Sequence, residues 1–565
     1  MERPPNLLTE STFKSFLNAQ TPNVLHLNEW NVPSSALNPS TNSVLPTYSV
    51  DNSATRSFLP IETNNDQFYN GIAHFSPPTS WIVPPEFMFP FSTFSPPTPL
   101  PPPPLPPPPP PPPPLSPPIT ASFIDGNSNT SMKPINIDPE AIMSVPEIIQ
   151  HWGYPVEEHR TLTSDGYILT LHRIPHGREN KDSKVRKPVV FLQHGLLCTS
   201  SIWLLNLPHQ SAGFIFADKG FDVWFGNMRG NVYSKQHISL DSDSNDFWKF
   251  SWEEMAEYDL PAMIDYVLNK TGQDSLYYVG HSQGSLTMLA KLSKDVEFSK
   301  KIRKFFMLAP VSRMSHVKGL FYYLGEIYEQ FKLVYRLFGD NEFMSNNIFT
   351  QLLTNIICDQ AVNNPLCENF IFSVSGPNSN QFNSSRIGIY LAHNPAGTSS
   401  RNMLHFAQMV HTKRMASFDR GREANIRWYG QSLPTEYNLT RIHCDLYLFY
   451  SDYDWLASAE DVEQFLIPTL PKTSVKFARR LKEFNHNDFL WGLRARKEIY
   501  DPIINIIKID NRRLILQKTM KNYYYKTRFT NAALNHNRAL ININNSSNIR
   551  KFKNDSFNIS RSNNG

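Results

Sequence analysis

Cysteine is scarce in this sequence, which limits the classes of protein it can encode. Only four of the 565 residues are cysteine: Cys198, Cys358, Cys367 and Cys444. So few cysteines cannot form the dense disulfide framework of a small secreted domain, and none of their spacings is that of a zinc site. Cys358 and Cys367 lie nine residues apart, and the spacing alone fits either a short disulfide loop or two buried free thiols. We therefore expect no structural metal.

Long apolar runs are also missing. No stretch reaches the roughly 18 apolar residues that a transmembrane helix requires, so we predict no transmembrane segment. The first residues, Met1–Asn6, lack the basic start and apolar core of a signal peptide. Taken alone, the second absence predicts a cytosolic protein.

An excess of one charge is absent from the middle of the chain, although the formal net charge is +4. Residues 1–130 contain 3 Lys and Arg against 8 Asp and Glu, whereas residues 511–565 contain 11 against a single acid, Asp555. The residues between are nearly neutral, so we expect no nucleic-acid partner for them. The basic tail fits a solvated disordered segment or one that contacts anionic surfaces, and the first interpretation is favoured.

Proline is abundant only before about residue 120. Residues 96–118 are nearly all proline and favour an extended polyproline II helix. Such a run is a spacer or a ligand for SH3- or WW-like domains, and the spacer is favoured because composition specifies no partner. We predict a disordered Pro/Ser/Asn-rich extension over residues 1–130, one folded unit over 131–510 and a basic, Asn- and Lys-rich disordered tail over 511–565.

Apolar strands alternate with helices in the folded unit, which predicts an α/β fold with a mostly parallel sheet and helices on both faces. The predicted strands are residues 167–174, 188–193, 221–226, 276–281, 303–310 and 445–450. The predicted helices are residues 145–152, 252–268, 285–292 and 496–508.

The pattern becomes helical and irregular over residues 313–430, which predicts an inserted helical cap. Apolar residues recur every three or four positions over 320–338 and predict one helix. That helix either packs on the core or forms a lid whose apolar face meets lipid, and the periodicity alone favours packing.

The most informative stretch joins a strand to a helix through Gly280-His281-Ser282-Gln283-Gly284. This is the pattern of a nucleophile elbow, in which a serine occupies a strained turn. Gly280 and Gly284 supply the small neighbours that the crowded turn requires, and the Gln283 amide is placed to donate to an oxyanion. An ordinary strand–turn–helix is the alternative, and the sequence context favours the elbow.

Candidate partners for Ser282 lie after later strands. Asp454 follows the strand over 445–450, and His486 comes later, which gives the chain order Ser–Asp–His of α/β-hydrolases. Asp452 competes with Asp454 as the acid. A second oxyanion donor, the amide of Leu196, is expected in the glycine-containing loop after the strand over 188–193.

Over about residues 136–509 the sequence resembles the acid lipase family, which includes gastric and lysosomal acid lipases. The segments that carry the resemblance are Asp165–Leu169, Arg173–Gly177, Phe191–Leu197, Gly220–Trp224, Tyr258–Ala262, Gly280–Gly284, Pro395–Ser399 and Asp454–Ala457. The resemblance implies an α/β-hydrolase with a lid-bearing cap, in which Ser282 is the nucleophile, Asp454 the acid and His486 the base. It also implies that the amides of Leu196 and Gln283 bind the oxyanion, and that no metal or organic cofactor takes part.

The resemblance further implies covalent modification. Cys358 and Cys367 match the family's cap disulfide, and the sequons at Asn269 and Asn383 lie at family glycosylation positions. Asn438 begins a third sequon in the folded unit. These features predict the secretory route, ending lysosomal or extracellular, while the missing signal peptide leaves a cytosolic location open.

We expect the protein to cleave carboxylic esters of neutral lipids, triacylglycerol or cholesteryl ester, at a lipid–water interface through an acyl-enzyme. The aromatic and apolar cap favours long acyl chains. The alternatives are a short-chain carboxylesterase and, from another class, a proline-rich interaction protein on an inactive hydrolase fold. The complete set of Ser282, Asp454 and His486 argues against the interaction protein.

Overall fold

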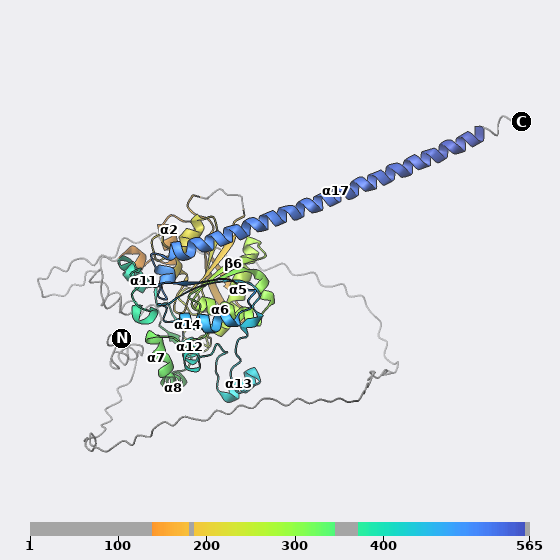
Figure 1. Ribbon diagram of the computed structural model, residues 1–565. Helices are drawn as coiled ribbons and strands as arrows, with labels where there is room; N and C mark the ends of the chain where they lie inside the picture. The colour runs from red at the N-terminus through yellow and green to blue at the C-terminus, as the bar shows by residue number, and fades with distance from the viewer. Residues whose placement is uncertain (1–137, 180–185, 345–370, 560–565) are drawn as a thin grey trace, which may run out of the picture. The chain divides into compact units, whose positions relative to one another are not determined.

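The computed structural model describes residues 138–179, 186–344 and 371–559 (Figure 1). The chain divides into two units, Met1–Ser122 and Phe123–Gly565, and all described residues belong to the second. The proline run, Cys358 and Cys367 lie outside the described residues, so the interpretations placed on them remain predictions.

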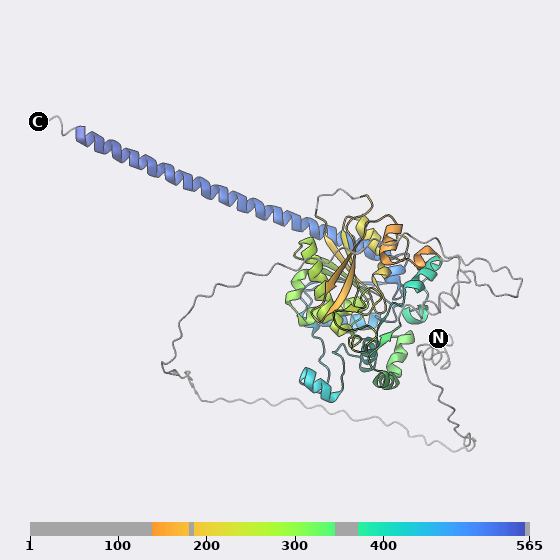
Figure 2. The same ribbon diagram turned by 180° about the vertical axis from the view of Figure 1, so that it is seen from behind.

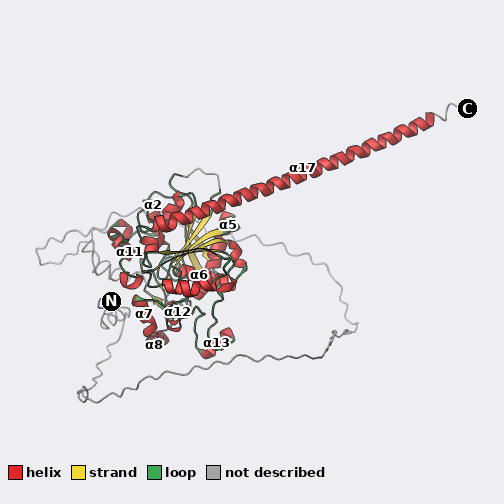
Figure 3. Ribbon diagram, in the orientation of Figure 1, coloured by secondary structure: helices red, strands yellow, loops and turns green. Residues whose placement is uncertain are grey.

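A single large sheet forms the centre of the described residues (Figure 3). Its strands are β1 (Glu157–Leu162), β2 (Tyr167–Ile174), β3 (Val189–Gln193), β4 (Asp222–Gly226), β5 (Gln236–His237), β6 (Leu276–His281), β7 (Ile302–Leu308), β10 (Asp445–Ser451) and β11 (Val475–Leu481). They lie in the order β1-β2-β4-β3-β6-β7-β10-β11, with β5 paired to β2. Pairing is antiparallel from β1 to β4 and parallel from β4 to β11. The predicted mostly parallel sheet is therefore confirmed.

Parallel pairing brings the carboxyl ends of four central strands, β3, β6, β7 and β10, to one edge of the sheet. Gln193 pairs with Gly280, and His281 pairs with Leu308. The loops that follow these strands therefore meet at that edge, where open α/β sheets bind their ligands.

Helices cover both faces of the sheet, as the two opposite views show (Figures 1 and 2). Those of the α/β core are α2 (Val145–His151), α3 (Ala212–Asp218), α4 (Trp252–Glu254), α5 (Leu260–Thr271), α6 (Gln283–Lys294), α14 (Ala459–Asp461), α15 (Ile467–Thr469), α16 (Asp488–Trp491) and α17 (Asp501–Ile559). Those inserted between β7 and β10 are α7 (Gly319–Glu326), α8 (Tyr328–Phe338), α11 (Ile387–His393), α12 (Ser400–Thr412) and α13 (Arg422–Tyr429). The inserted helices correspond to the predicted cap.

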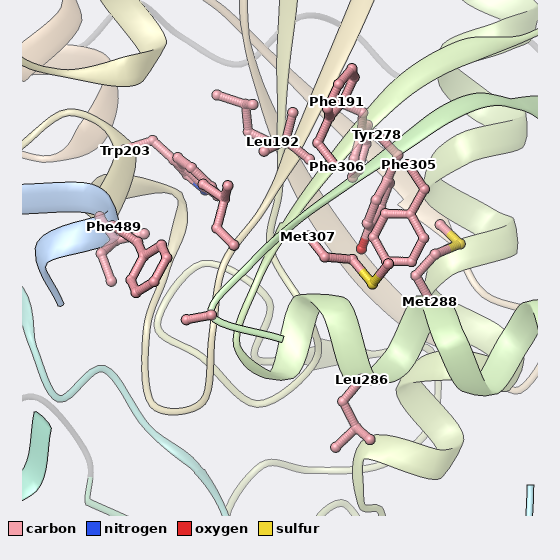
Figure 4. Packing of buried hydrophobic residues seen from close by; sticks show 14 of the residues in the cluster. Phe191, Leu192, Trp203, Tyr278, Leu286, Met288, Phe305, Phe306, Met307 and Phe489 are labelled. Carbon is pink, nitrogen blue, oxygen red and sulfur yellow. The ribbon is translucent and has the colours of Figure 1, made fainter. Parts of the chain in front are cut away.

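Aromatic packing supports the turn that follows β6. The Tyr278 ring stacks on Phe191 of β3 at a centroid distance of 5.8 Å and meets Phe305 of β7 edge-on at 5.3 Å (Figure 4). All three side chains are fully buried. The Tyr278 hydroxyl donates a 2.8 Å hydrogen bond to the Gly284 carbonyl at the start of α6. The core thus fixes the angle between β6 and α6.

The helix predicted over 252–268 contains a π-helical segment, η3 (Met255–Asp259), between α4 and α5. Pro261 lies at the start of α5, where its missing N–H removes a hydrogen bond from an α-helix and its ring crowds the preceding turn. A π-turn before the proline relieves both conflicts while the chain stays helical.

The single helix predicted over 320–338 is wrong in one respect, because the structure divides it into α7 and α8 at Ile327. Gly325 explains the division. A Cβ at Gly325 would lie 2.5 Å from the Val410 side chain, so the close packing of α7 on α12 requires glycine there, and glycine weakens the helix where α7 ends.

The tail predicted to be disordered over 511–565 is helical over its described part, since α17 runs to Ile559. Two facts account for this correction. Ile503, Ile504 and Ile507 are buried and fix the first turns, and no proline or glycine follows Pro502 until Gly565. A docked first turn removes the cost of nucleation, and a chain without breakers then propagates the helix. No helix among the described residues is both long enough and apolar enough to cross a membrane.

Candidate active site

Ser282 lies in a strained turn between β6 and α6. Its φ of +55° and ψ of −118° belong to a region that residues with side chains rarely occupy. A Cβ at Gly280 would lie 2.7 Å from the Gly284 carbonyl oxygen, and one at Gly284 would lie 2.6 Å from the Gln193 carbonyl oxygen. Since backbone atoms cannot move aside, only glycine fits at both positions. The local geometry is that of a nucleophile elbow.

His486 and Asp454 form a buried hydrogen-bonded pair. The Nδ1 atom of His486 lies 2.9 Å from Oδ1 and 3.0 Å from Oδ2 of Asp454. The amides of Leu456 and Ala457 also donate to Oδ1 of Asp454, at 2.9 and 2.8 Å. A carboxylate oxygen beside Nδ1 accepts a hydrogen bond from the Nδ1–H tautomer of His486, and in that tautomer Nε2 is the acceptor nitrogen of the ring.

Asp452, the competing acid, faces another partner. Its carboxylate is half exposed to solvent and bonds the Arg480 guanidinium, which also contacts Glu463. Asp454 is buried against His486 instead. The geometry therefore favours Asp454 over Asp452 as the acid.

The loop that carries His486 touches the elbow through His281. The Nε2 atom of His281 donates a 3.0 Å hydrogen bond to the His486 carbonyl, and the two rings lie 4.8 Å apart. Burial, with the nearby His486 and His194, holds the pKa of His281 well below its ordinary value, so this ring stays neutral. The His486 loop therefore packs against the residue that precedes Ser282. His281 lies inside the elbow motif, but nothing in the sequence signals this contact.

The loop after β3 approaches Ser282 closely at Gly195. A Cβ at Gly195 would lie 3.0 Å from the Ser282 Cβ and 3.1 Å from His281 Nδ1. His194 holds the loop: its Nδ1 donates to the Gly195 carbonyl at 2.8 Å, and its Nε2 accepts from the Met228 amide at 3.1 Å. Burial lowers the pKa of His194 to about 4, so it keeps this neutral tautomer near neutral pH.

The amides of Leu196 and Gln283 flank this point. No hydrogen bond among the described residues engages either amide, although both lie next to buried backbone. The Gln283 side chain is held by Asn402 of α12, whose Nδ2 donates to Gln283 Oε1 at 2.9 Å. The role of these two amides as oxyanion donors remains a prediction.

Asp488 is a buried carboxyl in the histidine loop to which the sequence assigned no role. Its Oδ2 accepts a 2.8 Å hydrogen bond from the Asn485 amide, and its own amide donates to Asn485 Oδ1 at 3.1 Å. Burial raises the pKa of Asp488 to about 6, and the nearby Asp454 carboxylate acts in the same direction. Asp488 therefore shapes the turn that presents His486.

A second serine–histidine contact lies elsewhere in the fold. His172 Nδ1 and Ser200 Oγ are 2.8 Å apart, and the Asn227 amide also bonds the Ser200 hydroxyl at 3.2 Å. His172 and Ser200 are fully buried. Ser200 begins the short 3₁₀-helix η2 (Ser200–Trp203) instead of a strand-to-helix turn, and its hydroxyl already has two partners. We assign this cluster to the support of the fold.

The predicted glycosylation positions that the structure describes lie at the surface or partly exposed. Asn269 is exposed on α5, and Asn438 is exposed before the 3₁₀-helix η7 (Leu439–Arg441). Asn383 is partly exposed and caps η6 (Ser384–Arg386). Their modification remains a prediction. Cys198 and Cys444 are free thiols.

Taken together, the parallel sheet, the elbow serine and the buried His–Asp pair define a hydrolase of the α/β-hydrolase class. Comparison with known proteins agrees. A family model for the alpha/beta hydrolase fold matches residues 188–493, and a model for a partial alpha/beta-hydrolase lipase region matches residues 145–207.

Three relatives illustrate the similarity. The chain is 47% identical over 377 residues to lipase lipl-1 of Caenorhabditis elegans, covering 66% of this chain and 93% of the relative. It is 44% identical over 373 residues to human lysosomal acid lipase/cholesteryl ester hydrolase, covering 66% and 92%. It is 41% identical over 398 residues to bovine gastric triacylglycerol lipase, covering 70% and 99%. The chain belongs to the acid lipase family, a group of carboxylic ester hydrolases, and the resemblance inferred from its motifs is confirmed.

Proposed function

We propose that the protein hydrolyses carboxylic esters of neutral lipids through an acyl-enzyme formed on Ser282. The observation that carries this proposal is the buried hydrogen bond between His486 and Asp454, held against the elbow by the His281 contact. This pair supports a role for His486 as the base that serves Ser282, because its loop contacts the residue that precedes the serine.

The chemistry follows from these positions. His486 Nε2 takes the Ser282 proton while Oγ attacks the ester carbonyl carbon, and Asp454 stabilises the imidazolium that forms. The amides of Leu196 and Gln283 stabilise the oxyanion, and each lowers the activation free energy by about 3 kcal/mol. His486 then protonates the leaving alcohol. Water attacks the acyl-enzyme, with His486 again as base, and releases the fatty acid.

The surface of the cap supports a lipid substrate. One side of α8 packs on α12, because Tyr328 forms a buried cluster with Leu404, Ala407 and Phe418. The other side carries apolar residues that stay exposed. Leu337 is 72% and Phe338 is 61% exposed, and Tyr322, Tyr323, Leu333 and Val334 add to this apolar surface. Of the two interpretations of residues 320–338, packing on the core fits the inner side of the segment, and contact with a lipid–water interface fits its outer side.

Relatives named as a cholesteryl ester hydrolase and as a triacylglycerol lipase support the two neutral-lipid substrates. The discriminating assay compares triolein, cholesteryl oleate and a soluble butyrate ester as dispersed and dissolved substrates of the purified protein. We expect faster turnover of at least one long-chain ester than of the butyrate ester. Preference for the butyrate ester would support the alternative, a short-chain carboxylesterase.

Covalent labelling tests the nucleophile directly. A fluorophosphonate probe should label the native protein, and Ser282→Ala should abolish labelling. Ser200→Ala is the matched control and should label normally, because its hydroxyl is buried between His172 and Asn227. If Ser200→Ala lost labelling while Ser282→Ala labelled fully, the nucleophile would be Ser200, beside His172, and not Ser282.

We also propose that the protein follows the secretory route to a lysosomal or extracellular location. The relatives named lysosomal and gastric support this, as does the surface exposure of Asn269 and Asn438. Protein from the native source should shift in mass after N-glycosidase digestion. Non-reducing peptide mapping should recover Cys358 joined to Cys367. No shift together with two free thiols would indicate a cytosolic enzyme.

A further inference from the structure

A cationic cleft lies where α17 leaves the α/β core. The cleft has a volume of about 450 Å³. Five of its lining side chains are cations and one is a carboxylate: Arg186, Lys187, Lys219, Lys508, Arg512 and Asp218. Among the described residues, none of these five cations forms an ion pair, whereas Asp218 already bonds Tyr154 and contacts Arg178. The cleft therefore carries an uncompensated positive charge.

The cleft is fixed by the anchorage of α17. Asp510 accepts hydrogen bonds from Arg303 at 2.6 Å and from Tyr277 at 2.8 Å, and it pairs with Lys304 at 3.3 Å. Burial alone would raise the pKa of Asp510, but Arg303, Tyr277 and Lys304 hold it below its ordinary value. The turn that carries Lys508 and Arg512 is thus held firmly against the core.

Beyond Asp510 the helix combines exposed apolar residues with positive charge. Ile509, Leu516, Met520 and Tyr523 are spaced by seven, four and three residues, which places them on one side of the helix. All four are exposed, Met520 by 72% and Tyr523 by 74%.

Leu534 and Ile541 continue the same side by helical period and are also exposed. Arg513 and Arg538 are exposed and lie at this stripe by the same period, so their long side chains can extend their charges past the apolar surface. The exposed cations Lys518, Lys521 and Arg528 lie toward the opposite side of the helix. Over residues 511–554 the sequence has no Asp or Glu at all.

We propose that the cleft and the exposed side of α17 together form a docking surface for a membrane that contains anionic phospholipid. Charge complementarity selects this occupant. The cations match phosphate and serine headgroups, while the exposed leucine, methionine and tyrosine side chains suit the boundary between headgroups and acyl chains.

The position of the surface defines its role. Lys187 and Lys219 precede β3 and β4, so the cleft lies at the amino ends of the parallel strands, whereas Ser282 follows the carboxyl end of β6. A membrane bound here leaves the catalytic edge uncovered. The surface thus attaches the enzyme to a membrane without occluding its active site.

Co-sedimentation of the full chain with vesicles tests the proposal. One set contains phosphatidylcholine alone, and in the other about a fifth of the lipid is phosphatidylserine. The protein should partition onto the second set, and added salt should weaken this binding. The double variant Lys508→Gln/Arg512→Gln should bind about thirtyfold more weakly, since each cation near an anionic membrane contributes about fivefold.

Two further variants separate the contributions. Leu516→Gln/Met520→Gln keeps helix-forming residues and should weaken partitioning by more than tenfold through lost apolar contact. The matched control Arg422→Gln/Arg427→Gln removes two exposed cations of α13 in the cap and should stay within about twofold of the native protein. Thermal unfolding should show the same midpoint for all three variants.

Several outcomes would overturn the proposal. Equal partitioning onto both vesicle types would contradict a role for charge, and an equal loss in the Arg422/Arg427 control would contradict a role for this site. Displacement from vesicles by short duplex DNA or by soluble glycerophosphoserine at equal charge concentration would assign the surface to nucleic acid or to free phosphate esters. None of these measurements depends on ester hydrolysis, and Ser282→Ala should partition like the native protein.

Discussion

Replacing Asp454 by asparagine is the sharpest test of the active site. Oδ1 of Asp454 accepts from the amides of Leu456 and Ala457 at 2.9 and 2.8 Å, so the side-chain oxygen of an asparagine would occupy that position. Its NH₂ group would then point at Nδ1 of His486. Because an NH₂ group only donates, His486 would have to accept at Nδ1 and carry its proton on Nε2.

A protonated Nε2 cannot take the Ser282 proton, so the catalytic base is lost although the fold remains. Where a triad aspartate is replaced by asparagine in another hydrolase, kcat falls about 10⁴-fold, which corresponds to about 5 kcal/mol of barrier. We expect a loss of this order in kcat for Asp454→Asn, with KM changed little. Steady-state kinetics on a soluble ester, with thermal unfolding as the check of folding, measure both.

Asp452→Asn is the matched control, because it makes the same chemical change two residues away. Asp452 is half exposed and bonds Arg480, a type of contact that contributes little at a surface. This variant should keep kcat within about twofold of the native enzyme, since its side chain is at the surface and contacts Arg480. A crippled Asp452→Asn beside a nearly normal Asp454→Asn would refute the assignment of the acid.

Three further predictions concern stability and boundaries. Because the pKa of Asp488 is raised to about 6, the folded state favours the neutral acid, and the stability that Asp488 contributes is lost as pH rises from about 4 through 6. The free energy of unfolding of Asp488→Asn, measured in urea relative to the native protein, should therefore rise by up to about 3 kcal/mol between pH 4 and pH 7.5. The same difference at both pH values would contradict the raised pKa. Gly284→Ala should lower the free energy of unfolding by about 2 kcal/mol or more, because its Cβ would clash with the Gln193 carbonyl. The control Gly388→Ala, whose Cβ would meet nothing within 4 Å, should leave the free energy of unfolding unchanged or slightly higher in the same assay. A chain limited to residues 131–510 should fold and hydrolyse a soluble ester at the native rate, and failure to obtain soluble, active protein would show that a removed end belongs to the folding unit.

The central strands could be predicted because burial on both faces leaves a simple signal. β3, β6 and most of β7 are continuous apolar runs, as strands between two helical layers must be. The edge strands β1 and β11 were not predicted. Glu157–Leu162 and Val475–Leu481 are rich in charged residues because much of each strand is exposed to solvent. A polar edge strand resembles a loop until its neighbour is known.

The candidate site could be predicted where chain order and strand ends define it. Ser282, Asp454 and His486 each follow a predicted or implied strand, and parallel pairing alone brings such positions together. The contacts of His281 and Asp488 could not be predicted in this way. Both side chains are polar and buried, and a sequence does not distinguish a buried histidine or aspartate from an exposed one.

Asn402 makes the cap energetically inseparable from the catalytic turn. Its side chain donates to Gln283 and Thr398 and accepts from the Trp252 amide, so α12, the elbow and the start of α4 share one buried polar network. A coupling free energy of this kind acts in both directions. A displacement of α12 changes the position of Gln283, and a group bound to Ser282 changes the stability of α12 by the same coupling free energy. We therefore expect the amides of α12 to exchange more slowly in the acyl-enzyme than in the free enzyme. The dynamics of the cap would then depend on whether Ser282 carries an acyl group.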